Sequence, residues 1–273
     1  MKKILSLLVA FGMIASLTAC AGQSSSTASD STADTTSESA AASESEAATA
    51  DTAAAAGTVL THEEYMAADV DTEVTIETYV QAKQSWWEDQ ATVYAQSEDG
   101  AYFLYNMACS EEDYDKLTPG TCIRVTGYKS EWSGEVEITD GTFEIVADAE
   151  PFIAQPLDVT DLLGSDELID HQNELVSFKG LTVEPPTVEG SDEEYAFLYN
   201  YDGSGTDGDD LYFKASCNGQ TYTFTIESYL CDNTTDVYAA VKNLQVGQTI
   251  DMEGFLYWYE GVNPHITSVT VVG

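Results

Sequence analysis

The sequence predicts a mainly β protein with two similar small domains, each made of five strands and a short helix. Short segments in which apolar and polar residues alternate are separated by turn residues, which is the pattern of half-buried strands. A twelve-residue segment also occurs twice, and the predicted elements follow in the same order in both halves. These observations favour a tandem all-β fold with few helices.

The repeated segment has a constant offset of 127 residues. Residues 117–128 (LTPGTCIRVTGY) match residues 244–255 (LQVGQTIDMEGF), and the same offset places Gly134 on Gly261. A repeat of more than a hundred residues is too long for a solenoid unit, so it indicates two similar domains. We place them at 58–150 and 151–273, and each is long enough for a small core.

Local patterns predict the elements of the first half. Thr61 and Glu64 have the spacing of a capping box, which opens a short helix. Ser110 caps a second helix, and the residues 98–100 are typical of a hairpin turn. We expect strands at 73–82, 91–96, 102–107, 123–128 and 135–146 and a helix at 111–117. The last strand is expected to break near Asp140.

The second half repeats this order. We expect strands at 174–183, 195–201, 211–217, 221–226, 249–257 and 266–272 and a helix at 236–244. The segments 195–201 and 211–217 share the second strand position, with an insertion between them. Asn218-Gly219 favours a tight hairpin turn. Five strands with a helix between the third and fourth form the OB-fold topology, a small Greek-key barrel. The predicted fold is therefore two tandem OB-fold five-stranded barrels.

The amino terminus has the pattern of an export signal. Met1-Lys2-Lys3 is basic, and 4–17 is an apolar stretch too short for a typical membrane-spanning helix. Leu17-Thr18-Ala19-Cys20 resembles the lipobox of bacterial lipoproteins, in which the peptide is cut before the cysteine and the thiol carries a diacylglyceryl group. We expect a signal peptide at 1–19 and a lipid-anchored protein, palmitoylated and facing outside the cytoplasm. The alternative is an ordinary secretory signal followed by a stray cysteine.

Residues 20–57 are predicted to be a disordered tether. Ala, Ser, Thr, Asp and Glu make up almost all of the segment, which has no aromatic residue and no apolar face. Such a composition cannot bury enough surface to offset the entropy of the chain.

Taken together, the lipobox at 17–20 and the strand order of 58–273 resemble those of a group of bacterial exported OB-fold proteins, many of them lipoproteins with one or two such domains. The resemblance implies binding of small ligands, cations or proteins, mostly without an established activity.

The charge of the chain bears on its partners. The chain has 48 acidic and 9 basic residues and a net charge of −39. Because so acidic a surface repels phosphate groups, we expect nucleic acid to be a disfavoured partner. The charge keeps an exported protein soluble, and the alternative interpretation is cation binding.

Tryptophans mark the candidate ligand site. If the fold is right, ligands meet the barrel near the loops that join strands one to two and four to five. The candidate binding residues in these loops are Lys83, Trp86, Trp87, Lys129, Trp132, Trp258 and Tyr259. Their rings suit stacking against a sugar or holding a peptide. The alternative is packing, because adjacent Trp86 and Trp87 in extended backbone point to opposite faces.

The remaining candidate sites are weaker. Asp202, Asp207, Asp209 and Asp210 offer oxygen ligands for Ca²⁺ in a flexible loop that lacks the closing glutamate of an EF-hand. No firm metal site is predicted, and Ca²⁺ at this loop is the only cofactor considered. Cys109, Cys122, Cys217 and Cys231 are two in each half, so they form either intradomain disulfides or buried free thiols.

The chain has no recognisable catalytic motif. His62, His171 and His265 have no metal-ligand spacing, and there is no GxSxG elbow, P-loop or dinucleotide fingerprint. We therefore expect a non-enzymatic binding module at the cell surface, for a small ligand, a glycan or a protein. The alternative is a structural or adaptor component of a cell-envelope complex, and a polysaccharide hydrolase comes third.

Overall fold

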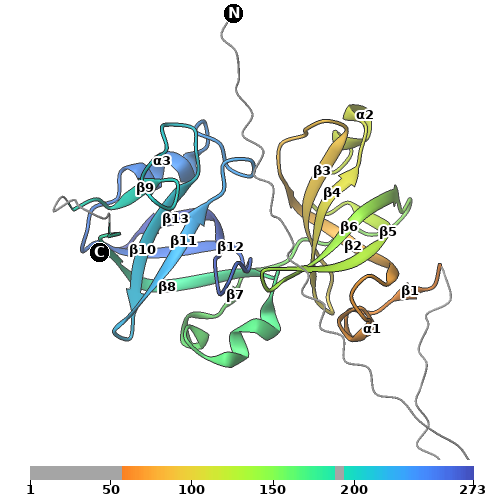
Figure 1. Cartoon of the computed structure of the whole chain (residues 1–273), viewed down its shortest axis with the longest axis horizontal. Coiled ribbons are helices and arrows are strands. Elements are labelled where there is room, and N and C mark those ends of the chain that lie inside the picture. The colour runs from red at the N-terminus through yellow and green to blue at the C-terminus, as the bar shows by residue number, and fades with distance from the viewer. Residues whose placement is uncertain (1–56, 188–193) are drawn as a thin grey trace, which may run out of the picture. The chain divides into compact units, whose positions relative to one another are not determined.

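A computed structural model of the chain describes residues 57–187 and 194–273 (Figure 1). The predicted signal peptide 1–19, the lipidation site Cys20 and all but the last residue of the predicted tether 20–57 lie outside the described residues. Among the residues described, none of the helices has both the length and the apolar character needed to cross a bilayer. The described residues belong to one compact unit, which contains two closed barrels.

The first barrel is a closed sheet of five strands. These are β2 (Glu73–Lys83), β3 (Gln90–Gln96), β4 (Ala101–Ala108), β5 (Cys122–Trp132) and β6 (Glu135–Ile145). The strands lie in the order β2-β3-β4-β6-β5, and the pairing of β5 with β2 closes the barrel. β1 (Val59–Leu60) adds to β2, helix α1 (His62–Ala67) precedes β2, and helix α2 (Glu111–Tyr114) lies between β4 and β5.

The second barrel has the same topology. Its strands are β8 (Leu175–Glu184), β10 (Leu211–Cys217), β11 (Gln220–Ile226), β12 (Thr249–Phe255) and β13 (His265–Val271). They lie in the order β8-β12-β13-β11-β10, and β10 pairs with β8 to close the barrel. The additional elements are β7 (Leu157–Asp158), the 3-10 helices η1 (Thr160–Leu162) and η2 (Asp166–His171), β9 (Phe197–Tyr199) and α3 (Asp236–Lys242).

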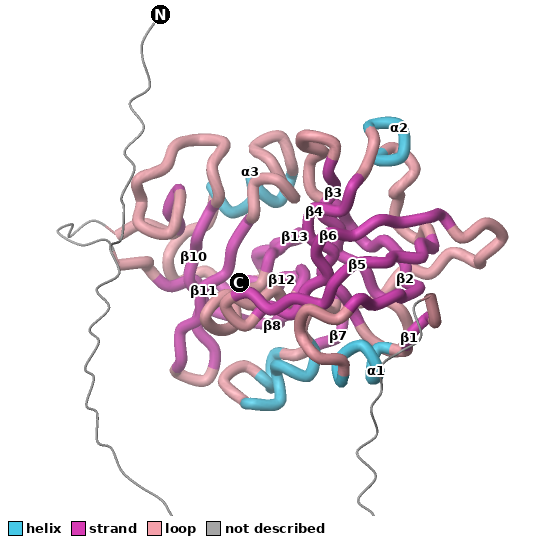
Figure 2. Tube along the Cα trace, turned by 45° about the vertical axis from the view of Figure 1, so that its right-hand side comes forward, coloured by secondary structure: helices cyan, strands magenta, loops and turns pink. Residues whose placement is uncertain are grey.

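The predicted fold class is confirmed. In each barrel the helix lies between the third and fourth strands, α2 in the first and α3 in the second, which is the OB-fold order. Strands dominate the described chain, and its helices are short (Figure 2). The capping box of α1 is present, with the Thr61 side chain bound to the Glu64 backbone N–H and the Glu64 side chain bound to the Thr61 backbone N–H.

The expected break in the last strand of the first half is wrong, because β6 is continuous from Glu135 to Ile145. The register of β5 with β6 shifts between Thr126 and Tyr128, where one residue of β5 faces two residues of β6. Asp140 has a φ of 50° in this bulge. The strand therefore absorbs the turn-like Asp140-Gly141 pair as a bulge and goes on.

The sequence repeat has a physical basis in both barrels. Gly120 and Gly247 adopt φ values of 88° and 87°, and their N–H groups donate to the carbonyls of Val80 and Val183 at 2.8 and 2.9 Å. A left-handed turn with φ near 90° favours glycine. The apolar positions of the repeat, such as Ile123 and Ile250, are fully buried, so the repeat encodes the same turn and the same core positions twice.

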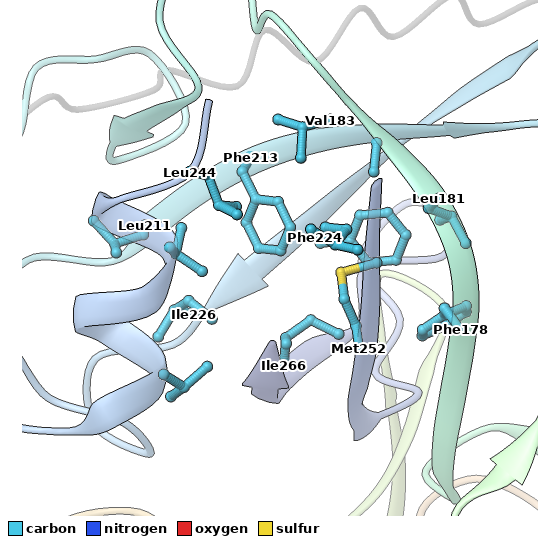
Figure 3. Close-up of a cluster of buried hydrophobic side chains, with 14 of the residues drawn as sticks. Phe178, Leu181, Val183, Leu211, Phe213, Phe224, Ile226, Leu244, Met252 and Ile266 are labelled. Atoms are coloured by element: carbon cyan, nitrogen blue, oxygen red, sulfur yellow. The ribbon is translucent and has the colours of Figure 1, made fainter. Parts of the chain in front are cut away.

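Each barrel has its own core. In β2 the alternate residues Val74, Ile76, Thr78 and Val80 are buried, as the alternating pattern of a half-buried strand requires. Figure 3 shows the core of the second barrel, where Phe213 and Phe224 lie among aliphatic side chains from β8, β12 and β13. Their ring centroids are 5.7 Å apart.

A third cluster joins the two barrels. Tyr94 and Phe103 of the first barrel pack against Phe255 and Tyr257 of the second. The rings of Tyr94 and Phe255 are stacked with centroids 4.5 Å apart. Backbone hydrogen bonds also cross this junction, for example from Ser85 N–H to the Tyr229 carbonyl at 2.7 Å.

Candidate ligand-binding cleft

The junction of the two barrels contains a cavity of about 970 Å³, which we call the cleft. It is lined by the loops that follow β2, β9, β11 and β12 and by residues of β3, β4, β5, β10 and β13. Its volume lies in the upper part of the usual range for ligand pockets, about 300–1,000 Å³.

Exposed aromatic rings line the cleft. Six of its aromatic side chains are 43–77% exposed, although soluble proteins seldom gather large apolar side chains at one exposed place. They are Trp87, Tyr105, Trp132, Tyr201, Tyr229 and Tyr259. Because both barrels supply these rings, the cleft exists only where the two barrels meet.

Two equivalent turns of the repeat meet at the rim of the cleft. Trp132 ends β5, Tyr259 lies in the loop after β12, and the repeat offset of 127 residues relates the two. Their rings are tilted against each other with centroids 5.0 Å apart. The N–H of Glu260 donates to the carbonyl of Ser133 at 2.7 Å, and these two residues are also equivalent by the repeat. Matching turns of the two barrels therefore hold each other in place.

The deep part of the cleft is a neutral hydrogen-bonded network. His265 of β13 is buried, and its Nδ1 lies 2.5 Å from the hydroxyl of Tyr94. The Gln84 side chain donates to the same hydroxyl at 3.3 Å. Burial lowers the pKa of His265 to about 3, so the imidazole is neutral. The neutral imidazole and the Tyr94 hydroxyl share one hydrogen bond, in which either group can be the donor according to the tautomer of His265.

Three carboxylates line the second-barrel side. Both backbone N–H groups of Tyr229 and Leu230 donate to Glu227, at 3.1 and 2.9 Å. Burial raises the pKa of Glu227 to about 7, and the negative charge of Asp210 adds to the effect. Asp210 accepts bonds from the Ser228 backbone N–H at 2.8 Å and the Ser228 hydroxyl at 2.6 Å. Glu260 is the third carboxylate, and its side chain is exposed.

Basic side chains are absent from the lining, as far as the described residues show. The ammonium group of Lys83 bonds to the Tyr114 carbonyl at 2.5 Å and lies 3.5 Å from the centre of the Tyr114 ring. That of Lys129 is buried and bonds to the carbonyls of Met66 and Ala68, both at 2.7 Å. Both candidate lysines thus hold backbone carbonyls, and we leave them out of the proposed site. Lys214 lines a neighbouring cavity of about 340 Å³.

The predicted tryptophans divide into two groups. Trp87 and Trp132 line the cleft together with Tyr259. Trp86 is half-buried instead, and its indole N–H donates to the Cys109 carbonyl at 2.9 Å. Trp258 is half-buried, and its ring packs against Gly134. Trp86 and Trp258 therefore make packing contacts and lie outside the lining of the cleft, and a role of any of these residues in binding stays a prediction.

The aspartate-rich loop does not form a cation site in the described residues. Asp202 binds Ser204, Asp209 binds Thr206, and Asp207 pairs with the ammonium group of Lys242 at 2.5 Å. No group of three or more acidic, histidine or cysteine side chains within the described residues has a geometry that could hold a metal ion. All four cysteines of the described residues, Cys109, Cys122, Cys217 and Cys231, are free thiols.

Sequence reasoning found Tyr259 but missed the other residues of the second-barrel wall of the cleft. Tyr201, Tyr229, Asp210 and Glu227 lie in or beside loops after β9 and β11, and nothing local brings them to the first barrel. The 127-residue offset of the repeat is established for 117–134 and 244–261 only, so the sequence carried no signal for these four residues.

Comparison with known proteins finds the fold among solved structures. No family model matches the chain, and no curated protein matches it. A hypothetical protein, ygiW from E. coli, is 19% identical over 33% of this chain and 91% of its own, with a TM-score of 0.25. The HINa domain of Ifi202, solved with a 20-bp double-stranded DNA, is 14% identical over 72% of this chain and 94% of its own, with a TM-score of 0.32. A replication protein A heterotrimer bound to single-stranded DNA is 13% identical over 72% of this chain and 49% of its own, with a TM-score of 0.29.

These likenesses concern the fold alone. They also correct one expectation from the sequence, that nucleic acid is a disfavoured partner. That expectation came from net charge, and it is wrong as an exclusion, because the similar structures include complexes with double-stranded and single-stranded DNA. Net charge describes the whole surface and not one binding face, so nucleic acid belongs among the ligands to be tested.

Proposed function

We propose that this protein is a non-enzymatic binding protein that holds its ligand in the cleft between the two barrels. The observation that carries the proposal is the group of six exposed aromatic rings around one cavity. Exposed apolar rings cost free energy in water, and a ligand that stacks on them recovers it. The polar side chains of the lining include amides, hydroxyls and carboxylates, which give a ligand hydrogen-bond partners.

The proposal includes attachment to a membrane through Cys20, outside the cytoplasm. The lipobox-like motif at 17–20 supports it, and the tether composition of 20–57 supports a separation of the barrels from the bilayer. Changing Cys20 to serine is expected to move the protein from the membrane fraction to the soluble fraction. Retention of the Cys20→Ser variant in the membrane fraction contradicts the lipid anchor, but it leaves the proposed binding role of the cleft unaffected.

The cleft is tested by a ligand panel and two matched variants. The panel contains oligosaccharides, peptides, small amines and oligonucleotides, and binding is measured by calorimetry. Tyr201→Ala and Tyr128→Ala each remove one exposed tyrosine, but only Tyr201 lines the cleft. We expect Tyr201→Ala to weaken binding at least fivefold, because a stacking ring contributes about 1 kcal/mol or more, and Tyr128→Ala to leave binding unchanged. Equal effects of both variants contradict the cleft as the site, and a ligand that the protein chemically converts contradicts the non-enzymatic role.

A further inference from the structure

We propose that the ligand of the cleft is an organic cation, whose ammonium group lies against the aromatic rings and is neutralised by Asp210, Glu227 and Glu260. This inference rests on the proposed function and names the chemical class of its ligand. The first observation behind it is the sign of the charge. Three carboxylates line the cleft, and no lysine or arginine of the described residues joins them there.

The basic residues nearby in sequence are already bound elsewhere. Lys83 and Lys129 hold backbone carbonyls, and Lys242 pairs with Asp207. Asp210 and Glu227 therefore face solvent or a ligand without a counter-charge from the lining, whereas Glu260 also lines the neighbouring cavity that Lys214 lines. A cation that enters the cleft supplies this counter-charge. Leaving water costs the cation less net free energy here than in a neutral cavity, because the carboxylates attract it.

The second observation is the kind of surface beside the carboxylates. The faces of tryptophan and tyrosine rings carry negative potential, which attracts alkylammonium and quaternary ammonium groups. Trp87, Trp132 and Tyr259 are exposed and line the same cavity as Glu260. Rings and carboxylates together select an organic cation over a hydrated metal ion, because a small metal ion needs several oxygen ligands in a tight shell. The described residues contain no such cluster.

The third observation concerns the oxygens that remain for a ligand. Both hydrogen bonds to Asp210 from Ser228 use Oδ1, so Oδ2 can accept from a ligand. The two backbone bonds to Glu227 use one oxygen each, which fixes the orientation of this carboxylate. Two of the three acids are thus held rigidly by their own loops before any ligand arrives, which lowers the entropic cost of binding.

Calorimetry on the full-length protein with spermidine tests the proposal. Glu260→Gln and Asp210→Asn are expected to weaken spermidine binding at least fivefold each. The matched controls, Glu63→Gln and Glu111→Gln, remove exposed carboxylates outside the cleft and are expected to change it less than twofold. Trp87→Ala is expected to weaken it at least threefold. Glu260 and Trp87 are exposed, so these two variants keep the test valid if Asp210→Asn fails to fold.

The outcomes separate the ligand class from the proposed function. Equal losses for cleft and control carboxylates show diffuse attraction to an acidic protein and overturn the inference. Binding of a neutral oligosaccharide or a single-stranded oligonucleotide that needs Trp87, without binding of spermidine, also overturns it but leaves the cleft as a binding site. If no ligand binds in a way that depends on Trp87, both the ligand class and the proposed function of the cleft are overturned. A trilysine peptide that binds in place of spermidine supports the inference and assigns the ammonium group to a protein partner.

Discussion

Replacing Glu135 by glutamine is expected to stabilise the protein at high pH and to have little effect at low pH. Glu135 begins β6 and is completely buried. Its Oε2 accepts a hydrogen bond from the backbone N–H of Trp258 at 2.8 Å, and its Oε1 has no hydrogen-bond partner among the described residues. Burial raises the pKa of Glu135 to about 8, against the opposing effects of the Asn173 side chain and the Trp258 N–H.

The sign of the pH dependence follows from proton binding. The ordinary pKa of a glutamate is 4.5, so between pH 4.5 and about 8 the folded protein holds a proton at Glu135 that the unfolded chain has released. Stability therefore falls as the pH rises through this window. At about 1.36 kcal/mol for each pH unit, the full loss is on the order of 5 kcal/mol. That is a large part of the 5–15 kcal/mol, roughly, that stabilises a typical domain.

Urea unfolding followed by tryptophan fluorescence at pH 5, 7 and 9 measures this effect. The glutamine variant cannot ionise, so its advantage over the unaltered protein is expected to grow by about 3–5 kcal/mol between pH 5 and pH 9. Glu63→Gln, at an exposed position, is the control and is expected to show no such growth. Parallel stability curves for the Glu135→Gln variant and the unaltered protein refute the reasoning, because they mean that Glu135 ionises in the folded state as it does in the unfolded chain.

Three further predictions concern two packing positions and the state of the cysteines. Trp86→Phe removes the indole N–H bond to a backbone carbonyl and is expected to cost about 1 kcal/mol of unfolding free energy. Trp87→Phe is expected to cost less than about 0.5 kcal/mol. If urea titrations show the larger loss for Trp87→Phe, the packing role given to Trp86 is contradicted. Gly254→Ala brings a Cβ to 2.3 Å from a backbone carbonyl oxygen and is expected to cost at least about 2 kcal/mol. In Gly141→Ala the new Cβ lies 3.0 Å from Cγ of the Met107 side chain, which can shift more easily than backbone, so a smaller loss of stability is expected in thermal melts. The four cysteines of the described residues are expected to react with a thiol reagent in denaturant without prior reduction, whereas two or fewer reactive thiols would mean that a disulfide forms.

The fold could be predicted from the sequence because its signals are local. Alternation placed β2 at 73–82, and the structure has it at Glu73–Lys83. The turn residues at 98–100 and 218–219 join the strands that they were expected to join. The bulge at Asp140 was the exception, since turn-like residues end a strand in one context and bulge it in another. Which of the two occurs depends on the partner strand β5, and local sequence does not record it.

The candidate site could be predicted only in part, because it depends on contacts between distant segments. Loop position placed Trp87, Trp132 and Tyr259 near a ligand face, and the structure brings them to one cavity. Sequence proximity suggested Lys83 and Lys129 for the same place, but a strand turns alternate side chains to opposite faces. Lys129 points inward and bonds carbonyls at the end of α1, which lies more than sixty residues earlier in the chain.

The two barrels contribute different chemistry to the cleft although they share one topology. The first barrel supplies the indole rings of Trp87 and Trp132, and the second supplies the carboxylates of Asp210, Glu227 and Glu260. The first barrel alone therefore offers aromatic rings without carboxylates, and the second alone offers carboxylates without indole rings. The equivalent turns that stack at the rim keep the two sets of groups together. The fold that both barrels share supplies the matching turns, and the loops that differ between them give the cleft its two different walls.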